Sequence, residues 1–307
     1  MFERVGPTAS KLGLVDPTAA GAGFALTRLA VAPDLADVVE RHWVVRWDLP
    51  PGTSFTQVLV PHPAANLVAE AGGCAAHGVP EGVFERTLTG AGVVVGVKFR
   101  PGALRVLLGH PDAVRRGVVV PASAFLGPDA DEVGRHALAL AAAGDDQAAV
   151  AAMAGLVRAR ARTVRTERTS RDLDLIAGAL AALVSGRVPP GAGVGALAAA
   201  AGTSTRSLQR LFATYVGVTP KWALQRHRVH LAADLLAADP RRPLAEVAAD
   251  VGYYDQAHFS TDFQRATGAT PAAYARRCAR SASALLASQG AGTAPGGQAD
   301  PATAGRA

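Results

Sequence analysis

The sequence predicts an α+β chain, in which a β-rich N-terminal domain with helices, a small barrel or sandwich, precedes an all-α domain. Two observations predict this. Short runs rich in Val and Phe alternate with turns from about His42 to Phe99, as in an antiparallel sheet. One motif then occurs twice between Leu197 and Arg277, with apolar residues at helical period. The 307 residues, of which 49% are hydrophobic, allow two such domains and a tail.

Five segments of the N-terminal part are predicted to be strands. They are His42–Trp47, Phe55–Val60, Asn66–Glu70, Phe84–Leu88 and Val93–Phe99. Their lengths and the turns between them favour an antiparallel arrangement. An apolar helix is expected over Ala103–Leu108, and a second helical block, about residues 131–162, is expected to close the domain.

The motif that occurs twice has the layout of a helix-turn-helix. Copy one contains Gly202, Leu208, Phe212 and Gly217–Pro220, and copy two contains Gly252, Phe259, Phe263 and Gly268–Pro271. Leu208 and Phe259, and the matching residues after them, are 51 positions apart, whereas Gly202 and Gly252 are 50 apart. Copy two therefore has one extra residue just after its first glycine. A turn tolerates such an insertion, so the two copies predict two units of one kind.

Each copy predicts an apolar helix, a sharp turn and an amphipathic second helix. Gly202 and Gly252 can supply the left-handed conformation that the turn needs. Ser204 or Thr203 in copy one, and Asp255 in copy two, are candidate N-caps of the second helix. The expected buried stripe of that helix is Leu208, Leu211, Phe212 and Tyr215 in copy one, and Phe259, Phe263 and Ala266 in copy two.

The exposed face of the second helix in copy one carries Arg206, Gln209 and Arg210, at i, i+3 and i+4. Arginine can pair twice with guanine and glutamine twice with adenine in the major groove of DNA. These three residues are therefore candidate base readers. The alternative is a polar face that only keeps the helix soluble.

The matching face in copy two carries Ala257, His258 and Thr261. Ala257 and Thr261 are candidates for contact with a thymine methyl group or a phosphate. His258 is a candidate donor to a base, and the alternative is that it caps its own helix. Sequence reading by this copy is therefore expected to be weaker than by copy one.

A long helix is predicted between the copies. Pro220 suits a first helical position, and Trp222–Ala238 runs without Gly or Pro to a stop near Asp239–Pro243. Two second helices at a fixed distance suit two major-groove segments about one turn, roughly 34 Å, apart. The residues expected to contact the DNA backbone are Thr205, Lys221, Gln256 and Ser260.

Residues of about 172 to 278 resemble the DNA-binding domain of the AraC/XylS family of bacterial transcription regulators. Gly252–Arg265, Gly268–Pro271 and Tyr274 are similar to the signature of the family, and Ser207–Phe212 to its first recognition helix. The resemblance implies a seven-helix domain with two helix-turn-helix units, and base reading at the six positions named above. The family often has a long side chain in the second recognition helix, where this chain has Ala257 and Thr261. The implied function is sequence-specific DNA binding in transcription regulation, without enzyme activity.

The stretch Gly96–Gly102 is similar to part of an uncharacterised N-terminal domain in some AraC-type regulators. This resemblance implies that the N-terminal domain senses a small molecule or dimerises. Trp43, His62 and Arg100 are candidates for lining a ligand pocket, with the arginine pairing to an anionic group. The alternatives are a core aromatic for Trp43, a turn residue for His62 and a loop anchor for Arg100.

The charge of the chain is compatible with an anionic polymer as partner, since the formal net charge is +6 and the pI is about 9.9. A dense basic run precedes the duplicated motif. It consists of Arg158, Arg160, Arg162, Arg165, Arg168 and Arg171. This run either contacts phosphates beside the operator or is a solvated interdomain segment.

The expected organisation is a sensing or dimerisation domain over residues 1–165, a DNA-binding domain over 166–280 and a disordered tail over 281–307. Double-stranded DNA is the expected partner, and a small-molecule effector, RNA polymerase and a second copy of the chain are further candidates. No cofactor, metal site or membrane contact is expected. Cys74 and Cys278 are too few for a disulfide framework, and with no signal peptide a cytoplasmic setting is expected.

Two other functions stay open at this point. The N-terminal domain could be an enzyme or repair module that the C-terminal domain delivers to DNA. A nucleophile with a nearby base, or a Cys and His metal set in residues 1–165, would favour that function, and the sequence shows neither. A DNA-binding protein without any ligand is the other alternative.

Overall fold

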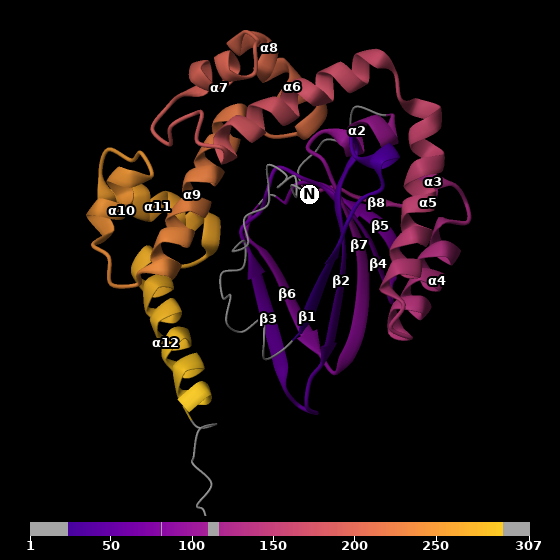
Figure 1. The fold of residues 1–307 in the computed structure, drawn as a ribbon, viewed down its shortest axis with the longest axis horizontal. Helices are drawn as coiled ribbons and strands as arrows, with labels where there is room; N and C mark the ends of the chain where they lie inside the picture. Colours follow the sequence, from indigo (N-terminus) through magenta and orange to yellow (C-terminus); the bar gives the residue numbers. More distant parts are fainter. Residues whose placement is uncertain (1–23, 81, 110–116, 291–307) are drawn as a thin grey trace, which may run out of the picture.

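The computed structural model describes residues 24–80, 82–109 and 117–290, of which 281–290 are described by their backbone alone. An N-terminal β-rich region is followed by helices that run around one side of it (Figure 1). Within these described ranges, we find no helix whose length and apolarity would allow it to span a bilayer.

The N-terminal region contains two antiparallel sheets. The larger has six strands in the order β1-β2-β7-β4-β5-β8, namely Ala25–Leu29, Val39–Asp48, Ala91–Phe99, Asn66–Glu70, Gly73–His77 and Val119–Pro121. The smaller pairs β3 (Ser54–Leu59) with β6 (Phe84–Thr89). Because β1 and β8 end the large sheet without pairing to each other, the described strands do not close into the small barrel that the sequence allowed.

The five strands predicted from the sequence are confirmed as β2, β3, β4, β6 and β7, each with its ends within three residues of the prediction. The sequence did not reveal β1, β5 or β8. β5 is built from small residues, and β8 has only three residues, so neither shows the alternation by which a strand is recognised. β1 is an edge strand with largely exposed side chains.

Helices α4 (Ala130–Ala142) and α5 (Asp146–Val164) cover one face of the large sheet (Figure 1). They replace the single predicted helical block, which is interrupted at Gly144 with φ 90°. Short helices at Pro33–Leu35, α2 (Ala103–Leu108) and α3 (Ser123–Leu126) complete the region. Both cysteines are buried, and neither is part of a disulfide.

The described C-terminal part has the seven helices that the resemblance implied. They are α6 (Glu167–Val184), α7 (Val194–Ala200), α8 (Thr205–Leu211), α9 (Pro220–Ala238), α10 (Leu244–Asp250), α11 (Gln256–Thr267) and α12 (Pro271–Gly290). A π-helical turn, η3 (Phe212–Val216), extends α8. The helix α12 continues ten residues into the segment that was predicted as a tail, and residues 291–307 lie outside the described residues.

The two helix-turn-helix units lie at opposite ends of α9, with α7 and α8 at one end and α10 and α11 at the other (Figure 1). The first unit shares one hydrophobic core with the N-terminal region. The closeness is clear at Gly102, before α2, where an added Cβ would lie 2.8 Å from Leu173 and 3.0 Å from Tyr215.

The second unit has a core of its own, and the N-terminal region reaches this core as well. Val60, directly after β3, is 2% exposed and belongs to the same cluster as Val229 of α9 and Phe259 of α11. Beside it, the rings of His62 and His230 are stacked, with centroids 4.2 Å apart and an interplanar angle of 3°. The N-terminal region therefore contacts both units.

Candidate DNA-binding surface

The first unit positions α8 by a glycine turn and an N-cap. Gly202 has φ 68°, which ends α7 in the left-handed conformation. The Ser204 hydroxyl accepts a hydrogen bond from the backbone N–H of Ser207 at 3.1 Å, so Ser204 and not Thr203 is the cap. The predicted stripe is confirmed, since Leu208, Leu211 and Phe212 are buried and Tyr215 is half-buried.

The opposite face of α8 carries Arg206, Gln209 and Arg210, all of which are exposed. Within the described residues, none of these three side chains forms a hydrogen bond or an ion pair. A long polar side chain that the fold does not engage keeps its donors available to a partner. This face therefore has the residue types, the exposure and the freedom that base reading requires.

The second unit repeats the geometry around α11. Gly252 has φ 79°, and the Asp255 carboxylate caps α11 by accepting from the backbone N–H of His258 at 2.8 Å. Phe259 and Phe263 are fully buried and meet edge to face, with ring centroids 5.6 Å apart. Tyr274 of α12 continues this aromatic contact at 5.5 Å from Phe263.

The comparison with known proteins agrees with this geometry. The sequence matches the family described as Helix-turn-helix domain over residues 197–277, from α7 into α12. The chain contains an AraC-type helix-turn-helix domain and is a DNA-binding transcription regulator. Residues 27–120 match a second family, the Domain of unknown function (DUF6597). The regulator thus combines a helix-turn-helix domain with an N-terminal domain whose family has no assigned function.

No curated protein matches the sequence. Three solved structures of ToxT from Vibrio cholerae are similar to it. One at 1.65 Å resolution has 11% identity, covers 83% of this chain and 98% of that chain, and gives a TM-score of 0.37. ToxT from strain O395 has 12% identity, coverage of 84% and 98%, and a TM-score of 0.36. ToxT from strain SCE256 with bound unsaturated fatty acid has 10% identity, coverage of 82% and 95%, and a TM-score of 0.34. At TM-scores this low, nothing about this regulator follows from the likeness.

The candidate base readers of α11 are short or engaged within the helix. Ala257, His258 and Thr261 are all exposed. The Thr261 hydroxyl donates to the Ala257 carbonyl at 3.0 Å, and His258 Nε2 lies 3.4 Å from the Asp262 carboxylate. The rings of His258 and Tyr253 are also nearly perpendicular, with centroids 5.2 Å apart. The recognition face of α11 therefore offers DNA fewer unengaged polar groups than that of α8.

Asp262, Gln264 and Arg265 have no role in the predictions from the sequence. Asp262 is 8% exposed, and its carboxylate accepts from Gln225 of α9 at 3.5 Å and from the Tyr253 hydroxyl at 3.5 Å. It therefore fixes α11 against α9. Gln264 and Arg265 are exposed and extend the face of Ala257 and Thr261 by one turn, which the i+4 spacing could have revealed.

Three of the four predicted backbone contacts lie at helix starts. Thr205 and Gln256 are the first residues of α8 and α11, and Lys221 is the second residue of α9. All three are exposed, and Ser260 is half-buried. Helix N-termini present unpaired backbone N–H groups, which suit a phosphate.

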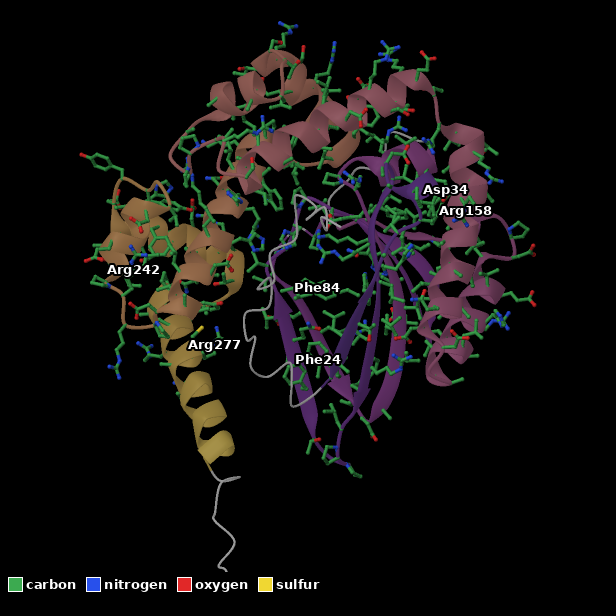
Figure 2. All side chains as sticks on the ribbon, viewed as in Figure 1. Phe24, Asp34, Phe84, Arg158, Arg242 and Arg277 are labelled. Atoms are coloured by element: carbon green, nitrogen blue, oxygen red, sulfur yellow. The ribbon has the colours of Figure 1, made fainter. Side chains whose placement is uncertain are left out.

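The basic run is largely engaged by the protein itself. Arg158 of α5 pairs with Asp34 at 2.6 Å (Figure 2), and Arg165 pairs with Asp37 at 2.5 Å. Arg160 donates to the Leu107 carbonyl at 2.8 Å, and Arg171 pairs with Glu167 of its own helix at 3.4 Å. Three of the six arginines thus tie the α5–α6 junction to the rest of the N-terminal region, which leaves fewer of these side chains for phosphates.

The three candidate ligand residues lie at different places. Trp43 on β2 donates its indole N–H to the Asn66 side chain at 3.3 Å, and its ring fills the space above Gly96. His62 stacks on His230 of α9. Arg100 follows β7 and is half-buried. The described residues include no group of three or more side chains suited to hold a metal.

Proposed function

We propose that this regulator reads two adjacent major-groove segments of one DNA site, with α8 in one segment and α11 in the other. The support is the rigid connection between them. With 19 residues, α9 is about 29 Å long at 1.5 Å per residue, close to the roughly 34 Å between successive major-groove segments. One chain therefore spans the distance that many regulators span with two subunits.

The observation that carries the proposal is the unengaged face of Arg206, Gln209 and Arg210 on α8. These side chains are the natural partners of guanine and adenine edges. On the opposite face, the buried side chains Leu208, Leu211 and Phe212 hold α8 in place. The weaker face of α11 leads us to assign most of the sequence discrimination to α8. We assign contacts with the DNA backbone to Thr205, Lys221, Gln256 and Ser260.

The N-terminal region is proposed to regulate this DNA-binding surface by contact rather than by catalysis. It shares a core with the first unit, and it touches the second unit through Val60 and His62. A small-molecule effector that binds beside His62 would alter the packing of the N-terminal region against α9. A cytoplasmic setting, pairing with a second copy and contact with RNA polymerase belong to the same proposal.

The experiment is selection of bound sequences from random duplex DNA with the full chain, at a stated salt concentration. The full chain is needed because the first unit and the N-terminal region share one core. Two enriched motifs about one helical turn apart would support reading by both helices. A single motif would restrict reading to one helix, and no enrichment would contradict the proposal.

A pair of variants separates base reading from backbone contact on the selected DNA. Arg210→Ala should lose about 1 to 3 kcal/mol at one base position and relax specificity there. Lys221→Ala should weaken binding to all sequences alike and reduce the salt slope by about one. Equal losses for Arg210→Ala on selected and unrelated duplexes would show that Arg210 does not read a base.

A further inference from the structure

Tyr254 is the most exposed large hydrophobic side chain in the described part of the chain. Its relative exposure is 101%, and it lies in the turn of the second unit, directly before the cap residue Asp255 of α11. Its neighbour Tyr253 is 6% exposed, packs on Phe259 at 5.5 Å and donates its hydroxyl to Asp262. Tyr253 therefore does the packing in this turn, and Tyr254 contributes nothing to it.

The position of Tyr254 has no counterpart in the first unit. There, α8 begins three residues after Gly202, whereas α11 begins four residues after Gly252. The extra residue moves one side chain out of the turn while both helices keep their caps. A single exposed aromatic residue needs no explanation by itself. Here it coincides with the only difference in length between the turns.

The turn before a recognition helix lies close to the sugar-phosphate backbone. In a helix-turn-helix, the N-terminal residues of the second helix contact base edges, and the first helix crosses the backbone. The turn connects these two positions. Tyrosine is one of the side chains that commonly donates to phosphate oxygens.

We propose that Tyr254 is an additional DNA contact of the second unit, in which its hydroxyl donates to a phosphate oxygen beside the segment that α11 enters. This inference rests on the proposed function. It gives the second unit an anchor that its recognition face lacks, because Thr261 and His258 are engaged within the protein and Ala257 is short. Phosphate contacts set the register of a protein on DNA without reading sequence.

The contact has a signature that separates it from a lysine contact. Tyrosine has no charge to replace a counterion, so its loss should lower the affinity without changing the salt slope. A phosphate contact should also affect selected and unrelated duplexes by a similar factor. Loss of a hydrogen bond to a charged oxygen corresponds to about a tenfold rise in Kd.

The test compares the wild-type chain with Tyr254→Phe and Tyr254→Ala on a duplex selected by the wild type and on an unrelated duplex, over a range of salt. Lys221→Ala is the comparator for the salt slope. Because Tyr254 is fully exposed, the melting temperature of both variants should equal that of the wild type. We expect Tyr254→Phe to raise the Kd about tenfold on both duplexes with an unchanged salt slope.

Three results would overturn the inference. An unchanged Kd for Tyr254→Phe would show that the hydroxyl does not contact DNA, even if Tyr254→Ala binds more weakly. A loss confined to the selected duplex would make Tyr254 a base contact. If the wild type itself binds no duplex, the proposed function fails and the inference fails with it. If the wild type binds and Tyr254→Phe has the same Kd, only the inference is refuted.

Discussion

Lowering the pH from 7 to 5 should destabilise the folded chain through histidines that are buried as neutral rings. Burial lowers the pKa of His42 to about 4 and that of His230 to about 3, from an ordinary value of 6.5. Burial also lowers the pKa of His62, and the neighbouring His230 acts in the same direction. The positive side chains of Arg226 and Lys98 add to these effects from α9 and β7.

The sign follows from proton binding. Between about pH 6.5 and pH 4, the unfolded chain binds protons at these histidines and the folded chain does not, so the free energy of unfolding falls as the pH falls. From pH 7 to pH 5, the values for His42 and His230 each give a loss of about 2 kcal/mol. Asp234 works against this loss, because burial raises its pKa to about 6 and its protonation would return about 1 kcal/mol.

A substitution isolates the contribution of the contact between the N-terminal region and α9. His230→Leu removes one titrating ring from the stack with His62, whereas His136→Leu removes an exposed ring of α4 as the matched control. The free energy of unfolding of each protein is measured by urea denaturation at pH 7 and pH 5. The difference between the two pH values cancels the packing cost of the substitution and the contribution of Asp234.

The wild type and His136→Leu should show the same loss between pH 7 and pH 5. His230→Leu should lose about 2 kcal/mol less. An equal loss for His230→Leu and the wild type would refute the reasoning, since it would mean that His230 gains its proton as readily in the folded state as in the unfolded one.

Two further predictions concern how the second unit is held. Gly252→Ala should lower the free energy of unfolding by more than about 2 kcal/mol, and Gly202→Ala by only about 1 kcal/mol, as measured by thermal unfolding. Both glycines have positive φ, but only at Gly252 would an added Cβ overlap the backbone of Gly191. Equal losses would show that the structure relieves this overlap. Asp262→Ala should cost about 1 to 3 kcal/mol, because it removes the acceptor of the buried Tyr253 hydroxyl, and a cost near zero would mean that α11 is held by its aromatic core alone.

The sequence by itself determined the elements whose signals are local. The strands β2, β4 and β7 show runs of apolar residues bounded by turns, and both helix-turn-helix units show a glycine, a cap and a buried stripe at helical spacing. These signals depend on neighbours within a few positions of the chain. For the same reason, the residues on the exposed faces of α8 and α11 are predictable from the sequence, since residues at i, i+3 and i+4 of one helix share a face.

Only the tertiary structure decided how these parts engage one another. The stack of His62 on His230 joins residues 168 positions apart, and the pairing of Arg158 with Asp34 joins residues 124 positions apart. A local pattern of residues cannot predict such contacts, because they depend on which distant segments of the chain the fold brings together. The same holds for β5 and β8, which are strands because partners lie beside them, and for Thr261 and His258, whose partners decide how much of the α11 face is left for DNA.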